Sequence, residues 1–331
     1  MAVTTLVRTP SVRHVPAPAP GSPGPSAPRM DRRLGIIAIV LSATAMGTAG
    51  LFGRMATPSG AVIGEALTLG RMLFGAIAML LVLVVSGRIG LVLRTRLSWS
   101  VVLGGVFLGL SLATYLSATV LTSLSLAVVL HLTGPALATV LARVVLKERP
   151  TRIAVVSLGI SVLGMVLAAG LSTERPAAGE GQLLGIVLGA VSGVLYGASL
   201  LCYRYRGDMP ADVRSLWNFV FGSLGAGAMV AVTRPDLSAM TPTNWAWAGA
   251  FFAVCGLFAL GLLVVAGKHL RSAELSALSY WEVVVAVLVG AAVFGETISG
   301  LAALGAVLIV VAAVLPFAAG RRRDVRGAAS R

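Results

Sequence analysis

Two charged side chains interrupt long apolar stretches of the sequence. Glu282 lies about ten residues into the stretch 273–294, and Arg71 lies about one and a half turns into the stretch 66–86. A carboxylate in such surroundings would bind a substrate ammonium group or carry a coupling proton, and a guanidinium would clamp a carboxylate through two hydrogen bonds. The structural alternatives are that Glu282 pairs with Arg71 or a hydroxyl, and that Arg71 reaches the end of its stretch or pairs with Glu65.

A histidine and three aromatic residues are further candidates. His131 lies about two turns into its apolar stretch, where a neutral imidazole would relay protons or would pack with one hydrogen bond. Tyr280 and Trp281 precede the buried carboxylate directly and lie too deep for an interfacial aromatic belt, which favours the lining of a cavity. Tyr115 is a weaker candidate of the same kind, and helix packing is the alternative for all three aromatic residues.

Cofactor and metal chemistry finds no support in the sequence. Cys202 and Cys255 both fall inside apolar stretches, and the three histidines are scattered along the chain. Neither set has the spacing of metal ligands or of a disulfide framework. No glycine-rich phosphate-binding loop ending in Gly-Lys-Ser or Gly-Lys-Thr occurs either, so we expect no metal, no cofactor and no ATP-driven step.

The elements that must position these residues are membrane spans. The chain is 57% hydrophobic and 11% charged, whereas soluble globular domains carry about 25% charged residues. About 20 apolar residues cross the hydrocarbon core as a helix, which satisfies its own backbone hydrogen bonds. The sequence therefore predicts an all-α polytopic membrane protein with ten transmembrane helices, at about 34–53, 66–86, 99–119, 124–145, 152–171, 183–203, 214–233, 245–266, 273–294 and 298–318.

Basic residues lie in every other connection between these spans. With the N-terminus inside, 22 Lys and Arg residues fall on the inner side, three fall on the outer side (Arg54, Arg175 and Arg234), and Arg71 remains within a span. The positive-inside rule then places both termini in the cytoplasm and the protein in the inner, or plasma, membrane. Because these charges lie in short turns and not along one helix face, nucleic acid is not an expected partner.

Both ends of the chain differ in composition from the spans. Residues 1–33 are rich in Pro and Ala and basic, and residues 319–331 are also basic. A proline-rich segment of this kind buries too little apolar surface to offset its ordering entropy. We expect a disordered cytoplasmic tail before the first span and a short basic cytoplasmic tail after the last.

The spans divide into two similar halves, 34–171 and 183–318. The halves align at an offset of 148, which places Pro135 against Val283 and Glu148 against Glu296. Five spans per half would invert the second half, giving two inverted five-helix repeats with a substrate site between them near the midplane. Pro135 would open its helix and expose carbonyls there, or would only kink it. The two glutamates are expected to cap helices or pair at the interface.

Short motifs recur in order in both halves, and through them the chain resembles the drug/metabolite transporter superfamily in its EamA-type branch. The resemblance covers nearly all of 34–318 and implies a ten-helix secondary transporter, often an exporter of amino acids, nucleosides or other small metabolites. Such proteins often carry Leu-Glu-Pro in the ninth helix; here Trp281-Glu282-Val283 stands instead, so a helix break is less expected. The motifs are Ala45-Met46-Gly47-Thr48-Ala49-Gly50, Leu69-Gly70-Arg71-Met72-Leu73-Phe74, Leu132-Thr133-Gly134-Pro135, Leu146-Lys147-Glu148-Arg149 and Phe294-Gly295-Glu296-Thr297.

The functional prediction is a secondary transporter that exports small organic metabolites by alternating access between the two repeats. A cavity holding both Glu282 and Arg71 would favour zwitterions, hence amino acids. The alternative is a membrane-embedded enzyme acting on a lipid or isoprenoid, but that chemistry calls for a cluster of Asp, His or Ser-His groups, and no Asp occurs in any span. The expected partners are a small-molecule substrate, with protons as a candidate coupling ion, and the lipid bilayer. A second copy of the chain is a further candidate.

Overall fold

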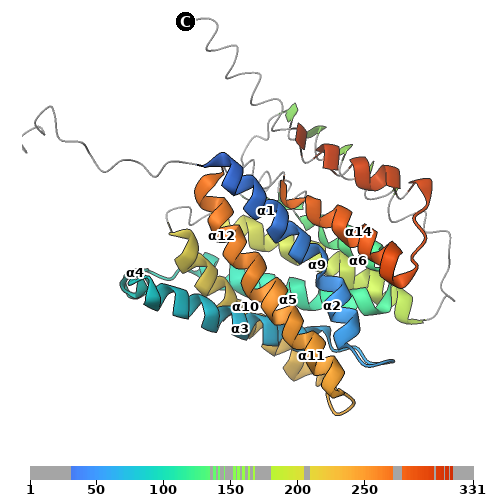
Figure 1. Ribbon diagram of the computed structural model, residues 1–331, viewed down its shortest axis with the longest axis horizontal. Coiled ribbons are helices and arrows are strands. Elements are labelled where there is room, and N and C mark those ends of the chain that lie inside the picture. The colour runs from blue at the N-terminus through green and yellow to red at the C-terminus, as the bar shows by residue number, and fades with distance from the viewer. Residues whose placement is uncertain are drawn as a thin grey trace, which may run out of the picture.

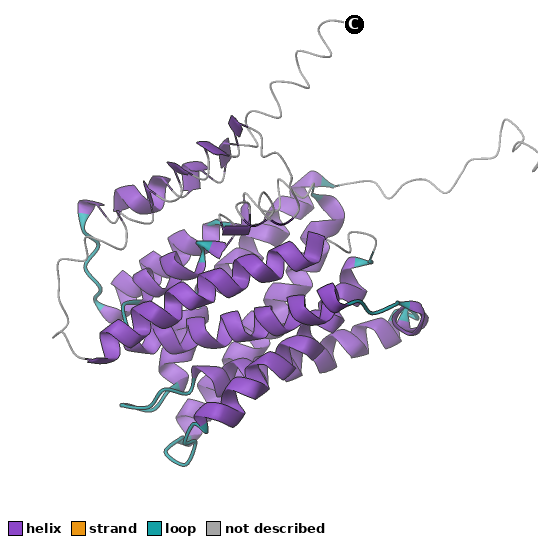
Figure 2. Cartoon of the chain, turned by 180° about the vertical axis from the view of Figure 1, so that it is seen from behind, coloured by secondary structure: helices purple, strands orange, loops and turns teal. Residues whose placement is uncertain are grey.

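The computed structural model describes residues 31–134, 180–204, 209–270 and 278–301, with scattered helical residues at 137–167 and 303–315. Every regular element in this part of the chain is a helix (Figure 1). The elements are α1 (Arg32–Gly47), α2 (Ala49–Ala56), α3 (Gly64–Val85), α4 (Ile89–Arg94), α5 (Trp99–Leu121), α6 (Leu124–His131), α9 (Glu180–Arg204), α10 (Ala211–Thr233), α11 (Pro242–Phe251), the π-helix η1 (Phe252–Phe258), α12 (Ala259–His269) and α14 (Trp281–Phe294). Seen from behind, the described loops lie at the ends of the helices (Figure 2).

Six of the described helices are long and apolar enough to cross a membrane. They cover Arg32–Ala56, Gly64–Val85, Trp99–Leu121, Gly181–Cys202, Asp212–Thr233 and Pro242–Leu263. These correspond to the predicted first, second, third, sixth, seventh and eighth spans, so a multi-pass membrane protein is confirmed. The other four spans are represented by shorter apolar helices, such as α14 and Ala303–Ala312, or lie partly outside the described residues. Ten spans therefore stay a prediction.

Several spanning segments depart from regular α-helix partway along their length. The first span breaks at Thr48, which separates α1 from α2, and the eighth carries the π-helix η1 between α11 and α12. α6 ends at His131 and is followed by a turn at Leu132 and Thr133. α14 begins only after a turn at Tyr280. Such interruptions leave backbone N–H and C=O groups without a helical partner. A membrane protein tolerates them only where protein or a cavity surrounds these groups.

The two halves of the chain repeat one helical plan. α9 begins 148 residues after α1 begins and ends 148 residues after α2 ends, and α12 ends 148 residues after α5 ends. Packing follows the same plan, because α5 lies on α9 as α12 lies on α1. In the fourth and ninth predicted spans, α6 lies on α9 and α14 lies on α1, through different parts of the two spans. The helices α3 and α10 pack on each other, and so do α6 and α14. Figure 1 shows α1 and α12 side by side, with α14 beyond them.

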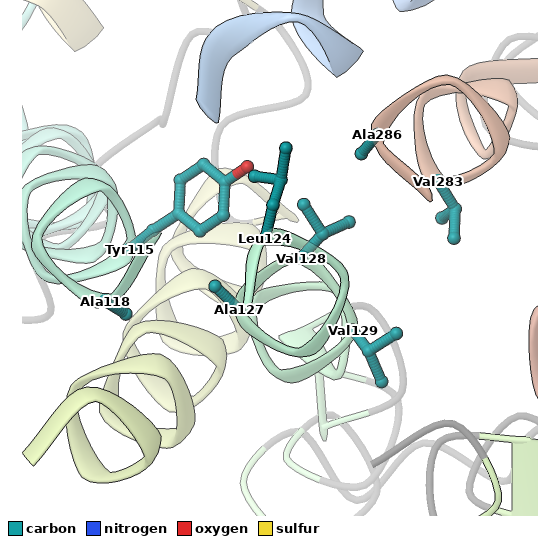
Figure 3. Packing of buried hydrophobic residues seen from close by; sticks show 8 residues of the cluster. All are labelled: Tyr115, Ala118, Leu124, Ala127, Val128, Val129, Val283 and Ala286. Atoms are coloured by element: carbon teal, nitrogen blue, oxygen red, sulfur yellow. The ribbon is translucent and has the colours of Figure 1, made fainter. Parts of the chain in front are cut away.

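The helices pack through small residues and local apolar clusters. One cluster joins α5, α6 and α14 through Tyr115, Leu124, Val128 and Val283, among others (Figure 3). Where α5 crosses α10, a Cβ atom on Gly109 would collide with the backbone of Gly222, so only glycine permits this approach. Close crossings of this kind bring the interrupted segments together around Arg71 and Glu282.

Candidate binding site

Arg71 is buried where α3 meets the break in the first span and the π-helix. Arg71 is only 5% exposed, and its Nη2 atom lies 3.2 Å from the Met46 sulfur on α1. The guanidinium carbon lies 5.4 Å from the centre of the Phe251 ring. Among the described residues, its Nε has no hydrogen-bond partner. A thioether and a ring face satisfy a guanidinium poorly, so Arg71 retains donors for an anionic group.

Glu282 lies across from Arg71 in the first turn of α14. A Cβ atom on Gly47 would come within 2.8 Å of the Glu282 carbonyl oxygen, which shows how closely α1 approaches α14 at its break. Within the described part of the chain, the Glu282 carboxylate makes no hydrogen bond or salt bridge. It lies within electrostatic range of both Arg71 and Tyr115. The turn at Tyr280 brings this carboxylate close to the helix start, where the helix dipole favours negative charge.

The two opposite charges share one site without forming a contact ion pair. Buried charges are costly unless they are paired and hydrogen-bonded, and a guanidinium and a carboxylate held apart leave part of that cost uncompensated. A ligand carrying both an anionic and a cationic group would satisfy both side chains at once. The arrangement therefore suits a zwitterion between α3 and α14.

His131 lies beside this site in a fully packed aromatic stack. Its ring is sandwiched between Tyr115 at 4.7 Å and Tyr196 at 4.8 Å, measured between ring centres. Its Nδ1 shares a hydrogen bond of 2.6 Å with the Ser192 hydroxyl, and the Ser111 hydroxyl donates to the Ser192 carbonyl at 2.8 Å. The stack joins α5, α6 and α9. This geometry fits the packing interpretation of His131, and a proton-relay role stays a prediction.

The other predicted site residues occupy different parts of the bundle. Tyr280 packs against the apolar cluster of α5, α6 and α14. Trp281 is 43% exposed and donates from its indole nitrogen to the Thr44 hydroxyl on α1; that it lines a cavity stays a prediction. Tyr115 is stacked on His131 and lies within electrostatic range of Glu282; its part in binding stays a prediction. Pro135 and Glu148 lie outside the described residues, although the turn that precedes Pro135 is described.

Glu65 has partners other than Arg71. Its carboxylate accepts hydrogen bonds from the Ser117 hydroxyl at 2.9 Å and the Thr233 hydroxyl at 2.8 Å, which ties α3 to α5 and α10 at one end of the bundle. The alternative in which Arg71 pairs with Glu65 is therefore wrong. The alternative in which Arg71 reaches the end of its span is wrong as well, since the residue is buried.

Glu296 forms a second network at the same end. It accepts hydrogen bonds from the backbone N–H groups of Leu124 and Ser125 at the start of α6, and it pairs with Arg54 at 2.9 Å. Arg54 also donates to the carbonyls of Thr119 and Thr122 at the end of α5. Glu296 thus caps a helix and pairs with a charge, as expected from its position in the repeat.

Sequence reasoning missed several residues around the charged pair. Met46 and Phe251 are apolar and gave no signal, and the Cys255 thiol, which donates to the Ala45 carbonyl at 3.1 Å, looked like any buried cysteine. The π-helix that carries Cys255 has no sequence signature of its own. Ser111 and Ser192 are small polar residues inside spans, a weak signal for the hydrogen bonds that they make. Among the described residues, no group of three His, Cys, Asp or Glu side chains is arranged to hold a metal ion.

Comparison with known families decides the class of this protein. The EamA-like transporter family matches residues 33–170 and again residues 183–317. The chain belongs to the EamA-like transporter family. The double match confirms the two repeats and places the protein in the drug/metabolite transporter superfamily. No curated protein matches the chain. A solved structure titled only "Crystal structure of protein" shares the fold, with a TM-score of 0.64 and 19% identity over 89% of this chain and 100% of its own.

Proposed function

We propose that this EamA-like transporter is a secondary transporter that exports small zwitterionic metabolites, with amino acids as the first substrate class. The observation that carries the proposal is the unlike-charged pair of the buried Arg71 and the partly buried Glu282; among the described residues, neither has a charged partner in contact. Arg71 would receive the substrate carboxylate, and Glu282 would receive the ammonium. Proton coupling through Glu282 is the competing role for that carboxylate.

Alternating access would arise from the two repeats. The interrupted segments that meet at the charged pair belong to both halves of the chain, with Thr48 in the first and Tyr280 in the second. In inverted repeats, one half rocks against the other around a fixed midplane site. The strong bias of basic residues supports an orientation with both termini in the cytoplasm of the cell and the Glu65 end of the bundle outside.

A panel of matched ligands in proteoliposomes tests the substrate class. Purified protein would be reconstituted with a labelled amino acid inside, and efflux would be measured with unlabelled competitors of three kinds: amino acids, the corresponding amines, and the corresponding carboxylic acids. We expect only competitors with both charges to compete well. Equal competition by amines alone would remove Arg71 from binding, and no flux with any amino acid would contradict the proposed substrate class.

The Arg71→Gln variant completes this test, with Arg94→Gln as its matched control. Arg94 is an exposed residue at the end of α4, away from the charged pair. We expect Arg71→Gln to weaken amino-acid competition by about tenfold or more, because a charge-assisted hydrogen bond contributes about 1.5–3 kcal/mol. The Arg94 variant should compete like the unchanged protein.

A further inference from the structure

A groove extends along the bundle from Gly256, which lies beside Arg71, to the end at Arg88 and Asp212; neither Arg71 nor Glu282 lines it. It has a volume of about 310 Å³ and runs between α3, α10 and the η1–α12 segment, lined by Gly75, Val82, Phe219, Gly256, Gly261 and Val265 among others. Gly256 marks its inner end, because a Cβ atom there would lie 3.6 Å from the Arg71 Cγ. At its other end, Arg88 and Asp212 form an ion pair of 2.5 Å.

The opposite end of the bundle is closed by hydrogen bonds between helices. The Glu65 carboxylate accepts hydrogen bonds from the hydroxyls of Ser117 on α5 and Thr233 on α10. Glu65 is only 3% exposed. Gly64 lies so close to Ser117 that a Cβ atom there would come within 2.6 Å of the Ser117 hydroxyl oxygen. At this end α5 therefore lies directly against α3.

Alignment of the two repeats shows which residues differ between the two ends of the bundle. The residue 148 positions after Ser117 is Val265, which lines the groove. Where Ser117 donates to the carboxylate at the start of α3, Val265 has no donor to offer Asp212, near the start of α10, and Asp212 pairs with Arg88 instead. In keeping with this difference, α5 packs on α9, α10 and α3, whereas its repeat equivalent, the segment α11–η1–α12, packs on α1 and α2, reaches α3 through η1 and contacts α10 only slightly.

We propose that the groove is the route by which substrate reaches the Arg71–Glu282 site from the cytoplasm, and that the Glu65–Ser117–Thr233 cluster is the gate that closes the outer end. The inference rests on the proposed function, because it assumes that the charged pair binds the transported solute. Opening the outer end requires α5 to leave α3 and α10, which breaks both hydrogen bonds to Glu65. Closing the inner end requires α12 to settle over the groove against Gly75 and Phe219.

Cysteine labelling tests the route without any substrate. Ala78 lines the groove, and Ile77 beside it is 61% exposed on the outer face of the same helix at the same depth. Each would be changed to Cys, and a charged, membrane-impermeant maleimide would be applied to inside-out and right-side-out vesicles. Peptide mass spectrometry would read each site apart from the native Cys202 and Cys255. We expect Ala78→Cys to react from the inside only and Ile77→Cys to react from neither side.

The gate is tested in the same vesicles with Ser117→Ala and, as a milder change, Thr233→Val. Each removes one donor to Glu65, so the outer end should open more often. Labelling of Ala78→Cys from the inside should fall several-fold, and Thr68→Cys, buried between α3 and α5, should begin to react from the outside. Thr57→Val is the matched control, because the Thr57 hydroxyl donates to the Gly53 carbonyl of α2, the helix that ends directly before it, and not to Glu65.

The outcomes separate the route from the transported solute. An unreactive Ala78→Cys, or one that reacts only from the outside, would overturn the route. Unchanged labelling in both well-folded gate variants would overturn the gate. If labelling follows the expected pattern while no zwitterion is transported, the proposed substrate class fails and the conformational assignment is supported.

Discussion

At the scale of single residues, charge inside an apolar segment was the informative signal. Arg71 and Glu282 were identified from the sequence because a charge in a span is rare and expensive, and the structure brings them to one site. Their apolar neighbours, Met46 and Phe251, resembled all other core residues and became visible only through packing. The sequence gives depth along a helix but not the face on which a side chain lies, so the 43% exposure of Trp281 and its hydrogen bond to Thr44 could not be predicted.

The Glu282→Gln variant should bind amino acids less tightly at every pH, because the amide cannot form the charge-assisted bond with an ammonium group. Affinity and exchange would be measured in proteoliposomes between about pH 5.5 and pH 8.5, so that a loss at every pH can be told from a change in pH response. Asp236→Asn is the control, since Asp236 is exposed and bonds to Ser238 in its own loop.

Two other results would reassign Glu282. Retained exchange with a lost response to a pH gradient would assign it the coupling proton. Unaltered affinity, flux and pH profile would leave it a structural residue.

The Glu296→Ala variant should lower thermal stability, because it leaves the first N–H groups of α6 and the Arg54 guanidinium without their acceptor. The loss of buried hydrogen bonds to a charged group costs about 1.5–3 kcal/mol each before relaxation, so a clear fall in the melting temperature of the detergent-solubilised protein is expected. Glu296→Gln should recover part of that loss, since its amide oxygen still accepts. A melting temperature equal to that of the unchanged protein would show that solvent replaces this network freely.

At the scale of elements, helix positions were predictable and helix interruptions were not. Apolar runs gave α3, α5 and α10 to within about three residues, since a span must be long enough to cross the hydrocarbon core. The break at Thr48 and the π-helix η1 depend on how neighbouring helices accept freed backbone groups, which is a tertiary effect. The turn at Tyr280 arises without the proline whose absence argued against it.

The Gly109→Ala variant should fold poorly. A methyl group there meets the Gly222 backbone, which has no side chain to move aside, and overpacking of this kind costs about 1–3 kcal/mol or more. Gly249→Ala is the matched control in α11, because nothing lies within 4 Å of the added atom. Monodispersity on size-exclusion chromatography and melting temperature would be compared. Equal behaviour of the two variants would mean that α5 and α10 do not cross so closely.

At the scale of the whole molecule, the bias of basic residues predicts the orientation, and the family match in both halves shows the repeat. A reporter fused after Arg331 should be active only in its cytoplasmic form, because ten spans would return the chain to the side on which it began. Paired cytoplasmic and periplasmic reporters at that site, with fusions after Arg234 as the opposite-side control, would measure this. An active periplasmic reporter after Arg331 would require an odd number of spans.

Deleting residues 1–28 should leave membrane abundance and transport unchanged. That segment is rich in proline and has no apolar face to contribute to a core. Transport would be normalised to protein abundance by immunoblot. Loss of transport at normal abundance would assign the tail a functional role.

The contact of α3 with α10 relates one repeat to the other, and its two ends carry unlike partners. In a perfect two-fold duplication the inward-open and outward-open forms would be isoenergetic and equally populated, whatever the strength of the contacts. Two different sequences in one chain remove that degeneracy: a hydroxyl stands at Ser117 and an isopropyl group at Val265. Each 1.4 kcal/mol of difference between the end contacts shifts the ratio of the two forms about tenfold. Because both repeats belong to one chain, substitutions in one half alone can set the ratio of the inward-open and outward-open forms in such a transporter without substrate.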